Sequence, residues 1–121
     1  MYKVSWIRYA SRIQKEDVLE MNVTTSVNEN TMTVVVDGEI NTITTPSLAE
    51  KVANLDGIQM LIFDVSRVPY ISSAGLRLFL ACQRTMMASG GDMVIRHCND
   101  LMWEIFESVG YDRIMKIEKM D

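Results

Sequence analysis

The sequence lacks the features that mark several large classes of protein. Its 121 residues contain no run of 18 consecutive apolar residues, which argues against a transmembrane helix. No cluster of Lys and Arg marks a nucleic-acid-binding surface. The N-terminus has no continuous apolar stretch followed by a small-residue cleavage site, so a secretory signal peptide is not expected. We therefore predict a cytoplasmic protein that contacts neither membrane nor nucleic acid.

Residues that ligate metals or form disulfides are also scarce. The chain has a single histidine, His97, and two cysteines, Cys82 and Cys98, whose spacing matches no zinc site. A small secreted scaffold would contain more cysteine, so we expect both thiols to be reduced. The sequence predicts no bound metal and no cofactor.

The length and composition indicate one globular domain. Apolar residues make up 48% of the chain and charged residues 23%, which argues against disorder. Residues 1–20 hold four of the 12 basic and three of the 16 acidic residues, so residues 21–121 carry eight and thirteen, a net charge of −5. Without a basic surface, any effect of this protein on transcription is expected to pass through another protein.

Hydrophobic periodicity predicts an α/β fold. The pattern predicts an antiparallel hairpin of residues 22–27 and 32–37 around a polar turn, followed by alternating strands and helices. This order predicts a mixed sheet of about five strands, with the later strands mostly parallel and the helices packed on it. The expected later elements are a helix with Thr45 as N-cap and Pro46 as first residue that runs to about residue 55, a strand at 58–65, a helix at 73–88, a strand at 92–98, a helix capped by Asn99 or Asp100, and an edge strand at 114–119.

Residues 1–20 show only a weak helical stripe, and we expect an N-terminal extension that precedes a domain at residues 21–121. An alternative is that this extension is not native. Lys15-Glu16-Asp17 can be encoded by a purine-rich run that resembles a ribosome-binding site, a few codons before Met21. Translation would then start at Met21, where the first strand begins.

The segment from residue 64 to residue 77 carries the most specific functional signal. A buried strand ends near Asp64, a short loop follows, and Ser72 and Ser73 begin a helix with Gly75 in its first turn. A helix start has unpaired N–H groups and the positive end of the helix dipole, which favour an anion such as a phosphorylated serine. The absence of a side chain at Gly75 would let a partner's backbone approach. A simpler interpretation is that one serine only caps the helix.

The same segment resembles the signature of the STAS domain, specifically that of the bacterial anti-sigma-factor antagonists. That signature is an apolar strand ending in Asp or Asn, then an aromatic residue, an apolar residue and Asp/Ser-Ser-Ser/Ala-Gly-Leu. Three further motifs match in kind and order, so the resemblance covers about residues 21–121. The matching stretches are Phe63-Asp64 with Tyr70-Ile71-Ser72-Ser73-Ala74-Gly75-Leu76, Val35-Val36-Asp37-Gly38-Glu39-Ile40-Asn41, Ser89-Gly90-Gly91-Asp92-Met93-Val94, and Phe106-Glu107-Ser108-Val109-Gly110-Tyr111.

The resemblance implies a STAS-type fold and a role as a switchable regulator. Members bind an anti-sigma factor that is also a serine kinase, which frees the sigma factor. Phosphorylation by that kinase abolishes binding, and a serine phosphatase restores it. The implied acceptor is Ser73, with Ser72 as second choice because serine stands where other members carry Asp. The implied partner surface includes Asn41, Asp64, Ser72, Gly75 and Leu76. No residue of this chain is expected to be catalytic, because ATP and Mg²⁺ belong to the kinase.

Several alternatives remain open from the sequence. STAS domains also occur as accessory subunits of ABC lipid-transport complexes and in stress-signalling scaffolds, and a shared fold does not separate these roles. Asn41 fits a turn as well as a contact, and Asp64 fits a loop cap as well as a kinase contact. A serine hydrolase with Ser73, His97 and Asp64 is a remote alternative, because the first glycine of Gly-x-Ser-x-Gly is missing.

Overall fold

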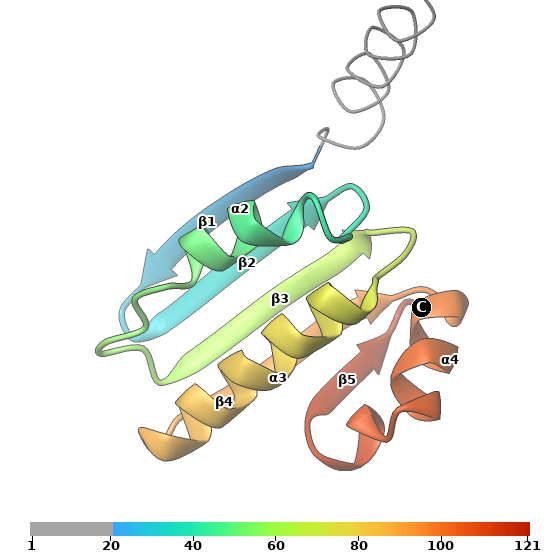
Figure 1. The fold of residues 1–121 in the computed structure, drawn as a ribbon. Coiled ribbons are helices and arrows are strands. Elements are labelled where there is room, and N and C mark those ends of the chain that lie inside the picture. Colours follow the sequence, from blue (N-terminus) through green and yellow to red (C-terminus); the bar gives the residue numbers. More distant parts are fainter. Residues whose placement is uncertain (1–20) are drawn as a thin grey trace, which may run out of the picture.

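A five-stranded sheet forms the centre of the computed structural model, which describes residues 21–121 (Figure 1). The expected N-terminal extension, residues 1–20, lies outside the described residues. The strands follow one another across the sheet in sequence order. They are β1 (Asn22–Asn28), β2 (Thr31–Asp37), β3 (Met60–Arg67), β4 (Asp92–Cys98) and β5 (Lys116–Lys119).

The sheet is mixed, as the sequence predicts. β1 and β2 form an antiparallel hairpin, whereas β2, β3, β4 and β5 pair in parallel. Each parallel pair is joined by a helical segment, because a chain that leaves one end of the sheet must return to the other end to add a parallel strand. The C-terminal ends of β2, β3 and β4 therefore lie at one end of the sheet.

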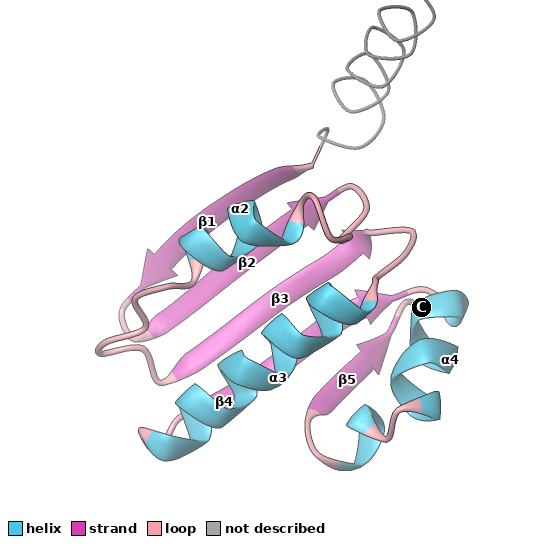
Figure 2. Cartoon of the chain, viewed as in Figure 1, coloured by secondary structure: helices cyan, strands magenta, loops and turns pink. Residues whose placement is uncertain are grey.

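Three α-helices and one 3₁₀ turn connect the parallel strands, and α2 and α3 lie over the same face of the sheet (Figure 2). Alternate residues of the central strands, such as Val34, Leu61 and Phe63, are buried beneath this layer. Phe63 meets Phe79 of α3 with ring centroids 4.7 Å apart. The helical elements are α2 (Thr45–Lys51), α3 (Ser73–Ala88), α4 (Asp100–Ser108) and η2 (Tyr111–Arg113).

The structure corrects some predicted boundaries. Thr44 rather than Thr45 is the residue before α2, and α2 ends at Lys51 instead of residue 55. Val52 is buried although it lies in the turn after α2. Its position fits the apolar spacing of a helix, so the pattern predicted a longer helix than the structure has. β3 begins and ends two residues later than predicted, because Ile58 lies in a turn and Arg67 still pairs with β2.

At the C-terminal end, η2 was not predicted, and β5 begins at Lys116 rather than at residue 114. Ile114 follows the 3₁₀ turn and is half exposed. Within residues 21–121, no helix has both the length and the apolar character needed to cross a bilayer.

Candidate functional site

Two loop segments run side by side where β2 and β3 end. The N–H of Gly38 donates to the carbonyl of Arg67 at 3.0 Å, and the N–H of Ile40 donates to the carbonyl of Tyr70 at 3.1 Å. The N–H of Ser72 then donates to the carbonyl of Ile40 at 2.8 Å. These bonds extend the parallel pairing beyond the strands. They hold the segment before α2 against the start of α3.

Helix α3 begins without a side-chain cap. Ser72 occupies the N-cap position with an extended backbone, and its carbonyl accepts the first helical hydrogen bond from the N–H of Leu76 at 3.0 Å. Its Oγ is buried and has no hydrogen-bond partner, so it does not cap the first turn. The first-turn N–H groups thus keep their capacity to bind an anion, reinforced by the positive end of the helix dipole.

The two adjacent serines differ in access to solvent. Ser73 is the first residue of α3 and is exposed, whereas the Oγ of Ser72 is buried. A modifying enzyme must bring a phosphoryl donor to within bonding distance of the hydroxyl it modifies. The geometry favours Ser73 over Ser72 as the group that an external enzyme reaches.

Gly75 contributes to this end of the molecule through packing. It is buried, and a Cβ at this position would lie 2.6 Å from Cγ2 of Ile40 and 2.7 Å from Cγ1 of Ile71. The missing side chain therefore lets α3 approach two buried isoleucines of the same chain. The expectation that Gly75 leaves space for a partner's backbone is corrected accordingly.

Asn41 is engaged in a turn. Its Oδ1 accepts from the N–H of Ile43 at 2.9 Å and from the N–H of Thr44 at 3.0 Å. Its Nδ2 donates to Oε1 of Glu39 at 3.3 Å. The contacts of Asn41 within the chain are therefore those of a turn residue. Asn41 is half-buried and lies at the same end of the sheet as Ser72 and Ser73.

Two residues from the C-terminal half secure the chain on either side of Ser73. The hydroxyl of Tyr111 donates to the carbonyl of Leu76 at 2.8 Å, in the first turn of α3. The Nδ2 of Asn99 donates to the carbonyls of Val68 at 3.2 Å and Pro69 at 3.4 Å, in the loop before α3. Both contacts span 30 residues or more, which fixes the start of α3 to distant parts of the fold.

Sequence reasoning missed these positioning contacts. Asn99 was expected only to cap α4, and its Oδ1 does accept from the N–H of Met102 at 2.8 Å. Tyr111 gave no local signal, because its partner lies 35 residues away. Burial raises the pKa of the Tyr111 hydroxyl, although Arg84 and Arg77 act in the opposite direction, so the phenol remains a donor at neutral pH.

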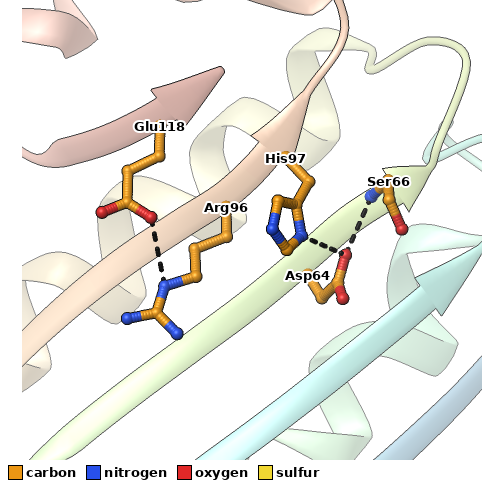
Figure 3. Close-up of polar contacts among 5 residues, drawn as sticks. All are labelled: Asp64, Ser66, Arg96, His97 and Glu118. Carbon is orange, nitrogen blue, oxygen red and sulfur yellow. Dashed lines mark hydrogen bonds and ion pairs between the residues drawn. The ribbon is translucent and has the colours of Figure 1, made fainter. Parts of the chain in front are cut away.

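Asp64 lies apart from this group. Its neighbours Phe63 and Val65 are buried under the helices, so by strand alternation Asp64 points to the opposite, open face of the sheet. Its Oδ1 accepts from the N–H of Ser66 at 3.0 Å and lies 3.3 Å from Nδ1 of His97 (Figure 3). The structure does not bring Asp64 together with Ser72 and Ser73.

His97 reaches Asp64 because β4 is irregular at this point. His97 has a positive φ of 66°, and the pairing with β5 shifts between Ile95 and Cys98. Arg96 and His97 consequently share the open face, where Arg96 pairs with Glu118 at 3.1 Å (Figure 3). Burial alone would raise the pKa of Asp64, but the hydrogen bonds from Ser66 and His97 outweigh it and hold that pKa below its usual value.

This arrangement does not assemble the residues of the hydrolase hypothesis. Asp64 and His97 meet on the open face, whereas Ser73 begins a helix that covers the other face. No hydrogen bond connects Ser73 with His97 among residues 21–121. The geometry gives no support to a Ser73-His97-Asp64 triad.

The chain and its fold are similar to those of known proteins. A family model described as STAS domain matches residues 22–120. The anti-sigma-B factor antagonist of Staphylococcus aureus is 24% identical over 103 residues, which cover 84% of this chain and 95% of that protein.

Two solved structures share the fold. An anti-sigma factor antagonist from Mycobacterium paratuberculosis superposes with a TM-score of 0.74 at 20% identity, and the match covers 82% of this chain and 86% of that one. The Bacillus cell fate determinant SpoIIAA in its phosphorylated form superposes with a TM-score of 0.65 at 18% identity, covering 79% and 90%.

Proposed function

The chain belongs to the STAS domain family, and from this premise we propose that it is an anti-sigma-factor antagonist controlled by phosphorylation of Ser73. In this proposal the unmodified protein binds an anti-sigma factor that is also a serine kinase. That kinase phosphorylates Ser73 and the complex dissociates, and a serine phosphatase reverses the modification. The names of the matched relatives support the antagonist role.

The observation that carries the proposal is the exposed hydroxyl of Ser73 at an uncapped helix start. The first-turn N–H groups have no side-chain partner, so they can stabilise the phosphoryl group within the modified protein. The hydrogen bonds of Asn99 and Tyr111 hold the backbone on either side of Ser73. An exposed hydroxyl is accessible to a kinase that acts on the folded protein.

Phosphorylation would act on binding through charge. It adds about −1.5 to −2 charges at one point of the contact surface. Water and the helix start can stabilise this charge in the free protein. An apposed partner surface that excludes water cannot do so without a matching cation, so the complex loses affinity.

Phosphosite mapping tests the assignment. The full chain would be incubated with its cognate anti-sigma-factor kinase, ATP and Mg²⁺, alongside Ser73→Ala, Ser72→Ala and Ser66→Ala. We expect Ser73→Ala to abolish labelling. Ser66→Ala is the matched control, because Ser66 is an exposed serine beyond Asp64 on β3 and should be labelled no differently from wild type.

Several results would contradict the proposal. Unchanged labelling of Ser73→Ala would move the acceptor elsewhere, and loss of labelling only in Ser72→Ala would assign it to the buried hydroxyl. Retention of the anti-sigma factor by the stoichiometrically phosphorylated chain would show that modification does not control binding. A transporter ATPase recovered in place of an anti-sigma factor would favour the accessory-subunit alternative.

A further inference from the structure

The two edges of the sheet differ in how they are protected against pairing with another strand. β5 is four residues long and carries Lys116, Glu118 and Lys119. Short, charged edge strands resist the addition of a further strand. β1 forms the opposite edge, is seven residues long, and contains no charged residue and no proline. It has none of the sequence features that usually block an edge.

β1 is also open to solvent. Six of its seven residues are exposed, and Val23 is half-buried. In an antiparallel ladder every second residue directs its N–H and C=O away from the neighbouring strand, so half of the backbone groups of β1 face outward. Within residues 21–121, no strand pairs with this outer side.

The sequence of β1 is almost the same in both directions. It is Asn-Val-Thr-Thr-Ser-Val-Asn, with Thr25 at its centre. If two copies pair antiparallel about Thr25, each asparagine faces an asparagine and each valine faces a valine. Thr24 then faces Ser26 of the second copy, and Thr25 faces its own counterpart. Such β-branched and hydroxyl pairs are favourable cross-strand neighbours.

We propose that β1 is the interface of a symmetric dimer in which two copies of this chain form one continuous ten-stranded sheet. The twofold axis passes through the Thr25 pair, perpendicular to the sheet. The pairing joins odd-numbered with odd-numbered residues, and even with even. Val23 and Val27 of both copies therefore stay on the helix-covered face, and both helical layers lie on the same side of the sheet.

This dimer would leave both functional ends free. The start of β1 pairs with Asp37 at the end of β2, directly before the Gly38 to Asn41 segment of the candidate site. The twofold axis reverses the direction of the second sheet half. The two Ser73 regions would therefore lie at opposite ends of the extended sheet, and each could bind a separate partner molecule. This inference does not depend on the proposed function.

The interface is expected to be weak. Pairing of two seven-residue strands buries less than the about 1,200 Å² of a standard interface. We therefore expect a concentration-dependent dimer in sedimentation velocity of the full chain between about 1 µM and about 1 mM.

Charge substitutions at the axis provide the test. Thr25→Lys and Thr25→Glu each place two like charges opposite one another, which should weaken the dimer about tenfold or more. An equimolar mixture of the two variants should recover dimerisation, because the introduced ammonium of one chain would then face the introduced carboxylate of the other. Thr85→Lys and Thr85→Glu are the matched controls, since Thr85 is exposed on α3 and should leave the dimer unchanged.

Each outcome bears on the proposal. A chain that remains monomeric throughout this range overturns it, including the case in which residues 1–20 cover the edge. A dimer that survives both Thr25 substitutions overturns it as well, as does failure of the mixture to associate when circular dichroism shows both variants folded. Loss in each variant with recovery in the mixture supports it.

Discussion

Polar groups near the end of β3 have hydrogen-bond or ionic partners within the fold, whereas those at the start of α3 lack side-chain partners. Asp64 has a backbone donor and a histidine beside it on the open face, and its neighbour Arg96 is paired with Glu118. Ser72 and Ser73 begin a helix with no side-chain cap, and the Oγ of Ser72 has no partner. The paired groups already have their interactions within the fold, whereas the helix start retains capacity for a phosphoryl group or a partner.

A change of charge at Ser73 should weaken partner binding far more than a change of charge at Asp64. We expect Ser73→Asp to weaken binding of the anti-sigma factor by about 100-fold, because it places an unpaired charge in a desolvated contact. Asp64→Asn should change binding little, since Asp64 faces the other side of the sheet. Titration calorimetry with the purified anti-sigma factor measures both. Equal losses of affinity in the two variants would contradict the expectation that only the start of α3 contacts the partner.

Gly75→Ala tests whether the helix start depends on close packing. Helix propensity alone would stabilise the protein by about 1 kcal/mol, because alanine replaces glycine within a helix. The added Cβ would meet Ile40 and Ile71 at 2.6 Å and 2.7 Å, however, and overpacking of this kind costs about 1–3 kcal/mol. We expect a net loss of about 1 kcal/mol in the free energy of unfolding, measured by urea-induced unfolding. A stabilised variant would show that the two isoleucines move aside readily.

Tyr111→Phe removes one of the two distant contacts that hold the start of α3. We expect a loss of about 1 kcal/mol in the free energy of unfolding, since a single hydrogen bond is removed without a cavity. Amide hydrogen exchange in the first turn of α3 should accelerate more than exchange elsewhere. Tyr70→Phe is the control, because Tyr70 is 43% exposed and should change neither quantity. Uniform acceleration across the sheet would assign Tyr111 a general packing role.

Asp64→Asn should have the smallest effect, a small loss of stability near neutral pH that disappears on the acid side. The pKa of Asp64 is lowered in the folded protein, so its contribution is fully present above the unfolded pKa of about 4 and is lost as pH falls through the folded pKa. We expect about 0.5 kcal/mol or less, because the side chains of Asp64 and His97 are 27% and 49% exposed. Thermal unfolding between pH 7 and pH 3 measures this. A variant as acid-sensitive as wild type would show that the pair contributes nothing.

Prediction from sequence was best where a pattern is local. The bounds of α3 and β4 were predicted at 73–88 and 92–98 and are found there, because apolar spacing and the Ser89-Gly90-Gly91 stop are contained in the segment itself. Prediction failed where tertiary packing extends or ends an element. Val52 lies in a turn and is nevertheless buried, so apolar spacing alone placed it in a helix. The 3₁₀ turn η2 follows Gly110, whose left-handed conformation redirects the chain in a way that apolar spacing does not predict.

For the candidate site, the sequence identified the residues but did not show which of them lie together in space. It identified Ser72 and Ser73 at a helix start, and that placement is confirmed. The family resemblance implied a partner surface that includes Asp64 with them, yet Asp64 points to the other face of the sheet. The sequence also predicted an external role for Gly75, and the contacts of Ile40 and Ile71 show an internal one.

The sequence by itself determined the α/β class, the hairpin, the order of the elements and the position of the serine pair, because each rests on residue spacing over fewer than about 20 residues. Only the tertiary structure decided which hydroxyl is exposed. It also brought Asp64 beside His97 and fixed the start of α3 through Asn99 and Tyr111. These relations join residues about 30 positions apart. They arise when strands pair and helices pack, which no local pattern encodes.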